Sequence, residues 1–426
     1  MSATASQPPE TNYSAAQQQS AARSRRNEHT RAITFTGALR LILPALVVAV
    51  VLILGAAVYY VRWGFNDAEW HGRRQAVPVW IAFNDIGRIM SRRVGDSADA
   101  VPVSGYDGQF YYYLARDPGI MVVCAHSQVR CPIDANPLRE ERVLYPLTAR
   151  VVALNNPDWL HVSLVLVNFA AILVTVLLVG QLCVEAGASR WLGMVVGIFC
   201  GELLGLLRDL ADPYAAMWVV LAVYLLRKNR PLWGAAAVGA ALLTREQLVL
   251  VLPLLALPLV AQRRWRTLAL AALIAFTPFV AWQVTLYGIF HRWGIKASLA
   301  TTHGVTYPFH GLWQYHNGPE FGVEVAFVAV PLLFTIVLSL AWLCRHGVRA
   351  LLTDPVPLVA LTYSLLLTLT AYSEWAGMFN SARLVTPAAA LGVLVACGLA
   401  PRLRRSYVAV LCATALAPLL MLPALY

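Results

Sequence analysis

The chain contains 426 residues, of which 59% are hydrophobic and only 13% are charged. Soluble domains carry about 25% charged residues, so this composition excludes an ordinary soluble globular protein. The net charge of +11 does not indicate nucleic-acid binding, because the basic residues form small clusters beside apolar stretches. Several of these stretches approach the roughly 20 residues that cross a bilayer. The sequence therefore predicts an all-α polytopic membrane protein that does not bind nucleic acid.

The first 38 residues are rich in Ser, Ala, Gln and Arg and show no apolar periodicity, which predicts a disordered tail. Its arginines hold the tail in the cytoplasm by the positive-inside rule. The first span, from about Leu39 to Val61, then runs outward. Residues 39–426 are expected to form a single membrane domain in the inner (plasma) membrane.

Five further clusters of basic residues mark cytoplasmic turns, and the chain must cross the membrane an even number of times between successive clusters. We therefore expect about eleven spans, with the N-terminus inside and the C-terminus outside. The clusters are Arg190; Arg227, Lys228 and Arg230; Arg263, Arg264 and Arg266; Arg345 and Arg349; and Arg402, Arg404 and Arg405.

The first outer loop runs from about residue 62 to residue 142, and we expect it to lie on the membrane. An apolar stripe at Phe83, Ile86, Met90 and Val94 predicts an amphipathic interface helix, and Tyr145 to Leu154 predicts a second one. Cys124 and Cys131 share this loop, where a disulfide can persist, and the sequence leaves their pairing open.

Within this loop, Tyr106-Asp107-Gly108-Gln109 precedes an aromatic helix that Pro118 stops. Asp107 suits a helix N-cap, a general base at the membrane surface, or both roles together. Tyr106 and Gln109 flank it as candidate substrate-binding residues. At the end of the loop, Arg142 and Tyr145 either point into a cavity or, for the arginine, snorkel to lipid headgroups.

Two later excursions, Trp191 to Leu226 and Leu232 to Gln262, are too short for two full spans, which need about 40 residues. Their polar tips should lie below the outer membrane surface, where charges require a protein-lined wet cavity. Alternatively, Arg245 and Glu246 merely neutralise each other at a helix break. The candidate site residues in the tips are Arg208, Asp209, Asp212, Arg245 and Glu246.

Two more outer segments contain candidates. Residues 290–322 combine Trp and Tyr with four histidines, among them His303, which suits either sugar binding or an aromatic interface belt. In the last polar turn, Arg383 at the mouth of a helix is a candidate phosphate ligand, with Asn380 and Glu374 nearby.

The stretches Tyr106 to Tyr112 and Arg142 to Leu147 resemble a little-characterised bacterial subgroup of the GT-C class of membrane glycosyltransferases, associated with surface glycopolymers. Asp209 to Pro213, Leu243 to Glu246 and Asn380 to Pro387 are similar to later motifs of that class. The resemblance implies a GT-C-like fold, an essential acidic residue in the first outer loop, for which Asp107 is the match, and a donor phosphate site in later outer turns. Asp107 is followed by Gly108, so a divalent metal stays possible but without an acidic pair to support it.

The implied activity is inverting transfer of a sugar from a polyprenyl-phosphate donor to a cell-envelope glycan or glycolipid on the outer face, with membrane lipids as further partners. Asp107 would take the acceptor proton, and Arg245, Arg383 and Arg208 would neutralise the phosphate. Asp209, Asp212, Glu246 and Glu374 would orient those arginines or bind sugar hydroxyls. A transporter or flippase of a lipid-linked sugar is the main alternative, and a non-catalytic scaffold for envelope assembly is a third.

Overall fold

The structure is a computed structural model that describes residues 35–59, 69–70, 73–74, 83, 86, 105–126, 139–296, 306–318 and 320–416. The chain divides into Met1–Leu43 and Pro44–Tyr426, and the arrangement below concerns the second unit. Most of the predicted tail, His303 and Cys131 lie outside the described residues. Helix α2 (Phe35–Tyr59) begins four residues inside the predicted tail.

Five stretches of helix are long and apolar enough to cross a membrane. The fold is therefore that of a multi-pass membrane protein, in which the two-residue pairing of β1 (Glu69–Trp70) with β2 (Arg73–Arg74) is the one sheet in the described ranges. The expected total of eleven spans stays a prediction. The five stretches are Arg40–Val58, Pro157–Glu185, Trp265–Phe290, Phe321–His346 and Met378–Cys397. The first lies in α2, the second includes α8 (Leu160–Glu185), the third is α14 (Trp265–Phe290) and the last is α21 (Met378–Cys397). The fourth consists of α17 (Phe321–Glu324), η5 (Val325–Ala329) and α18 (Val330–His346).

The remaining helices are shorter and complete the bundle. They are α5 (Gly108–Arg116), α6 (Ile120–His126), α7 (Leu144–Val152), η2 (Pro157–Trp159), α9 (Leu192–Gly197), α10 (Cys200–Leu207), α11 (Asp212–Arg227), α12 (Pro231–Leu242), η3 (Glu246–Leu250), η4 (Leu252–Ala256), α13 (Leu257–Ala261), α16 (His310–Gln314), η6 (Val348–Leu352), α19 (Val356–Thr368), α20 (Tyr372–Trp375) and α22 (Pro401–Thr414).

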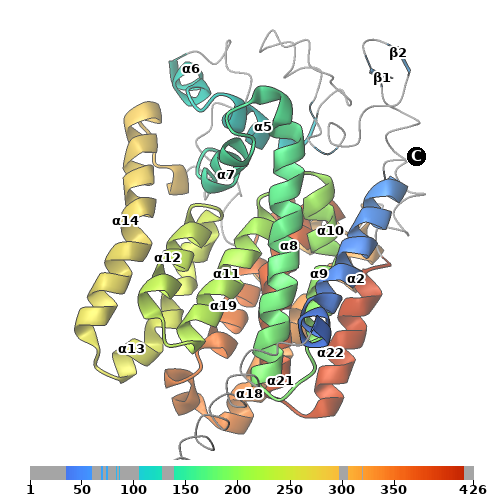
Figure 1. Cartoon of the computed structure of the whole chain (residues 1–426), viewed down its shortest axis with the longest axis vertical. Coiled ribbons are helices and arrows are strands. Elements are labelled where there is room, and N and C mark those ends of the chain that lie inside the picture. Colours follow the sequence, from blue (N-terminus) through green and yellow to red (C-terminus); the bar gives the residue numbers. More distant parts are fainter. Residues whose placement is uncertain are drawn as a thin grey trace, which may run out of the picture. The chain divides into compact units, whose positions relative to one another are not determined.

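Helices α14, α12, α11 and α8 lie side by side in that order, and each packs against the next (Figure 1). Helix α21 packs against α10, α11, α18 and α19, and 89% of its span is buried, whereas only 22% of the α14 span is buried. Because α14 leaves most of its apolar surface uncovered, that surface suits contact with lipid chains. Helix α21 instead forms the centre of the core.

A glycine sets the close approach of α10 to α21. A Cβ atom at Gly201 would overlap the carbonyl oxygen of Ala382 and would lie 2.6 Å from the hydroxyl oxygen of Thr386. Both neighbours belong to buried α21, which cannot easily move away. The close packing of α10 against α21 therefore requires a glycine at position 201.

We expect Gly201→Ala to destabilise the fold by about 1–3 kcal/mol, because it overpacks this contact. Thermal unfolding of the detergent-solubilised protein measures the effect. Gly288→Ala is the matched control, since a Cβ there meets no described atom within 4 Å. The control should be neutral or stabilising by up to about 1 kcal/mol. Equal losses in the two variants would contradict the packing argument.

The predicted basic turns meet at one end of the second unit. Lys228 pairs with Glu185 at 2.7 Å, and Arg227 pairs with Asp354 at 2.9 Å, so three separate turns are joined. Arg264 lines the same cavity as Arg227 and Asp354. Helices α5, α6 and α7 lie at the opposite end, in the upper part of Figure 1. These turns therefore share one end of the unit, and their place on the cytoplasmic side of the membrane stays a prediction.

The two short excursions are built of short helices, and their incomplete crossing of the membrane stays a prediction. The first contains α9 and α10 and then turns into α11, and the second contains α12, η3, η4 and α13. Their tips are buried, with Asp209 0% and Arg245 2% exposed. The predicted helix after the first outer loop is α7, and Cys124 in α6 is disulfide-bonded.

Candidate functional site

Asp107 lies immediately before α5, but it does not cap that helix. Its backbone is already helical, and its side chain accepts no hydrogen bond from the first turn. The carboxylate is instead held between two arginines, with Oδ1 2.5 Å from Arg139 and Oδ2 accepting a hydrogen bond of 2.8 Å from Arg383. The N-cap interpretation is therefore wrong, because two long-range ion pairs take up both carboxylate oxygens.

The two arginines determine the protonation state of Asp107. Only 6% of the residue is exposed, and burial by itself raises the pKa of a carboxyl group. The positive charges of Arg139 and Arg383 outweigh that effect and hold the pKa of Asp107 well below its usual range. The carboxylate is consequently ionised at every physiological pH.

A chain of ion pairs connects Asp107 to both buried tips. Arg383 lies 4.0 Å from Asp212 Oδ2, and Asp212 Oδ1 lies 3.3 Å from Arg245 Nε. Glu246 beside it accepts two hydrogen bonds, of 3.0 and 3.1 Å, from Arg142. Arg245 and Glu246 thus pair with other segments and do not simply neutralise each other. The structure gathers predicted candidates from four separate parts of the chain.

The ion-paired chain has an excess of positive charge and unused donors. It contains four arginines (Arg139, Arg142, Arg245 and Arg383) and three carboxylates (Asp107, Asp212 and Glu246). Arg245 Nη1 and Arg383 Nε are buried and have no hydrogen-bond partner in the described part of the chain. A buried N–H group without an acceptor is costly. An anion with several oxygens would satisfy these donors.

An aromatic cluster lies beside Asp107. The hydroxyl of Tyr106 donates a hydrogen bond to Asn380 Oδ1. The guanidinium of Arg208 lies over the rings of Phe379, at 4.5 Å, and Tyr106, at 5.4 Å. Three predicted candidates (Tyr106, Arg208 and Asn380) therefore share one wall of the site, which combines ring faces with polar groups.

Other predicted candidates have different surroundings. Tyr145 is fully buried, donates to the carbonyl oxygen of Leu164 and accepts from Asn168, so its hydroxyl is bonded within the protein. Gln109 and Asp209 are buried. Glu374 is half-buried in α20 and interacts electrostatically with Tyr106.

Sequence reasoning missed three site residues. Arg139 is a direct partner of Asp107, and Tyr111 accepts a hydrogen bond of 3.3 Å from Arg142. Glu141 accepts a hydrogen bond of 2.8 Å from Gln283 of α14. The dense run of charges Arg139-Glu140-Glu141-Arg142 before an apolar helix was the available signal, because buried charges are paired. No cluster of three or more metal-ligating side chains occurs among the described residues.

The environment of Glu141 makes the stability of the protein depend on pH. Burial, and then the negative charge of Glu246, raise the pKa of Glu141 from 4.5 to about 8. The folded state therefore binds this proton more tightly than the unfolded chain does. Its contribution to stability is present below pH 4.5 and is lost as the pH rises toward 8.

Glu141→Gln should remove this loss, because the amide stays neutral and still accepts the hydrogen bond from Gln283. Relative to wild type, the variant should become more stable between pH 5 and pH 8, by at most about 1.4 kcal/mol per pH unit. Thermal unfolding across this range tests the prediction. Glu185→Gln, at the exposed end of α8, should not reproduce the trend. A stability difference between Glu141→Gln and wild type that does not change with pH would contradict the prediction.

No family model, curated protein or solved structure matches this chain.

Proposed function

We propose that this protein is an integral-membrane glycosyltransferase that moves a sugar from a polyprenyl-phosphate donor to a hydroxyl group on a cell-envelope glycan or glycolipid. The observation that carries the proposal is the ionised Asp107 held between Arg139 and Arg383. A carboxylate beside arginines with unused donors provides both a base and a phosphate site. In the proposed orientation, the basic turns face the cytoplasm and this site faces outward.

The arginines would bind the donor phosphate. Arg383 Nε and Arg245 Nη1 are buried donors without acceptors in the described residues, and guanidinium groups bind phosphate oxygens strongly. The phosphate of the donor carries one negative charge and gains a second when the sugar leaves. Fixed positive charges around it therefore stabilise the transition state more than the ground state.

Binding of the phosphate would also activate Asp107. A carboxylate paired with two arginines is a weak base, because protonation would break both ion pairs. Once phosphate oxygens share Arg383, Asp107 loses part of this stabilisation and its pKa rises toward the usual value. The base would then gain strength only when the donor is present.

The reaction forms a bond between the acceptor oxygen and the anomeric carbon. The acceptor hydroxyl gives its proton to Asp107 as its oxygen attacks. The bond between the anomeric carbon and the phosphate oxygen breaks, and the electron pair leaves on the polyprenyl phosphate. Attack opposite to the leaving group inverts the anomeric configuration. Tyr106 and Asn380, which share a hydrogen bond beside Asp107, would contact hydroxyl groups of the sugar.

The test measures sugar transfer by the purified protein in lipid vesicles. The vesicles are supplied with a panel of polyprenyl-phosphate sugars as donors and with extracted envelope glycans and glycolipids as acceptors. Mass spectrometry of the lipids follows consumption of each donor. We expect one donor to be consumed, and Arg245→Gln to lower turnover about a hundredfold, as loss of one transition-state donor does. Arg405→Gln, which removes an exposed arginine at the basic end, is the matched control and should leave turnover unchanged.

Two results would contradict the proposal. If no donor is consumed while labelled lipid-linked sugar crosses the vesicle membrane, the protein is a transporter. If a donor is consumed equally by wild type and Arg245→Gln, the phosphate site lies elsewhere.

A further inference from the structure

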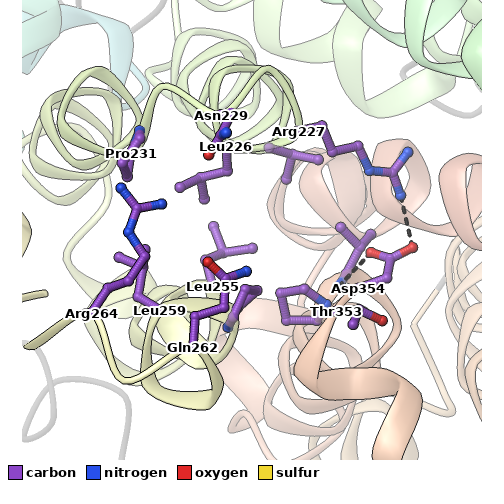
Figure 2. A pocket seen from close by; sticks show the side chains of 14 residues that line it. Leu226, Arg227, Asn229, Pro231, Leu255, Leu259, Gln262, Arg264, Thr353 and Asp354 are labelled. Carbon is purple, nitrogen blue, oxygen red and sulfur yellow. Dashed lines mark hydrogen bonds and ion pairs between the residues drawn. The ribbon is translucent and has the colours of Figure 1, made fainter. Parts of the chain in front are cut away.

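A cavity lies between three segments at the basic end of the second unit, and Asp107 does not line it. It has a volume of about 490 Å³, within the range of ligand pockets. Its walls are the turn between α11 and α12, the turn between α13 and α14, and the start of α19 (Figure 2). The glycosyl-transfer mechanism uses none of its residues.

The mouth of this cavity is polar and basic. Arg264, Gln262 and Asn229 are exposed at its rim, and Figure 2 shows the side chains of Arg264 and Gln262 on one wall facing Asn229 on the other. Arg227 also lines the cavity and is paired with Asp354. Two arginines against one aspartate leave a net positive charge. Among the described residues, Arg264 has no side-chain ion pair.

The floor of the cavity is apolar and borders a second cavity of about 400 Å³. The two cavities share Leu226, Pro231, Leu255 and Leu259. The second cavity runs between α12 and α14, where Leu268, Ala271, Ala272 and Ala275 form one face of α14. From Leu268 to Ala275 this face extends about 11 Å along the helix.

This apolar groove can be reached from the lipid side. Val260 and Ala272 at its edge are exposed, and only 22% of the α14 span is buried. A hydrocarbon chain in the bilayer therefore has direct access to it. The basic mouth lies at the end of the same helix, where a lipid headgroup would be.

We propose that the two adjacent cavities together bind an anionic phospholipid, with its phosphate at Arg264 and Arg227 and one acyl chain in the groove between α12 and α14. A soluble anion would leave the apolar groove unfilled, and an apolar molecule would leave the basic mouth unmatched. Basic pockets between helices at a cytoplasmic membrane surface recognise anionic headgroups in this way. Gln262 and Asn229 supply donors for headgroup oxygens.

The experiment counts lipids bound to the delipidated, detergent-solubilised protein by native mass spectrometry. Phosphatidylglycerol, phosphatidylethanolamine and inorganic phosphate are titrated separately. We expect phosphatidylglycerol to bind about tenfold more tightly than phosphatidylethanolamine, and inorganic phosphate to bind far more weakly than either. Arg264→Gln should weaken phosphatidylglycerol binding about fivefold, the usual effect of one basic residue at a membrane surface.

Three variants on α14 test whether the groove holds an acyl chain: one fills the groove and two are controls. Ala272→Leu places a larger side chain in the groove and should weaken binding of both lipids at least fivefold. Ala269→Leu, on the same helix but outside the groove, and Arg266→Gln, at the start of α14 but outside the cavity, should leave binding of both lipids unchanged. Equal affinity for the two lipids, or no effect of both Arg264→Gln and Ala272→Leu, would overturn the assignment. So would phosphate binding as tightly as the lipid.

Discussion

Asp107→Asn should lower sugar transfer by roughly a hundredfold or more, because it removes the proposed general base. The asparagine amide has nearly the same shape and still accepts a hydrogen bond from Arg383, so the site keeps its outline. Turnover per folded molecule, measured with the donor that wild type consumes, is the relevant quantity. Full activity of this variant would exclude Asp107 as the base.

The same substitution affects stability, and a control must separate the two effects. Asp107→Asn removes the anion that Arg139 and Arg383 share and leaves Arg383 only its longer contact with Asp212, and breaking a buried pair costs about 3–5 kcal/mol. Because the folded pKa of Asp107 lies below its ordinary value of 3.8, this difference from wild type should be present at neutral pH and fade as the pH falls below 3.8. Asp107→Glu keeps the charge and should retain most of the stability.

Glu246→Gln should destabilise the protein by about 3–5 kcal/mol, because it leaves the buried guanidinium of Arg142 without a negative partner. The two side chains are 1% and 6% exposed, and two hydrogen bonds join them. Solvent cannot replace the lost interaction at this depth. Thermal unfolding in detergent, supported by resistance to proteolysis, measures the loss.

Two comparisons make this prediction specific. Asp354→Asn breaks the partly exposed pair with Arg227 and should cost at most about 1 kcal/mol. The double variant Arg142→Met with Glu246→Leu removes both charges and should recover much of the stability lost by Glu246→Gln. If the buried and exposed single variants lose the same amount, burial does not determine the strength of these pairs.

Local sequence patterns predicted an all-helical membrane protein and the burial of the tips, but they did not predict the partners of the charges. Two excursions too short to cross the membrane had to place Asp212 and Arg245 inside the protein, and the structure confirms this. An N-cap role was predicted for Asp107 because an aspartate before a helix is a common cap. Arg383, which binds it, lies 276 residues later. Such a pairing depends on tertiary packing and leaves no local trace.

Arg139 shows the same limit at closer range. It stands beside Glu140 and Glu141, so the run appears locally balanced, yet its partner is Asp107. The turn before α7 directs these neighbouring charges to different partners. Glu141 contacts α14 and Arg142 contacts the second buried tip. The backbone path, which sequence periodicity does not determine, assigns each charge its partner.

The separation of Asp107 from Arg383 also has a consequence for biosynthesis. At roughly 5–20 residues per second, the ribosome needs about 14–55 s to extend the chain from the first residue to the second. During that interval the Asp107 carboxylate has only the nearer of its two arginine partners, Arg139, because Arg383 has not been made. The span with the largest buried share, α21, is among the last helices to be synthesised. The ion-paired chain around Asp107 is therefore complete only once α21, which carries Arg383, has been synthesised and has packed into the core.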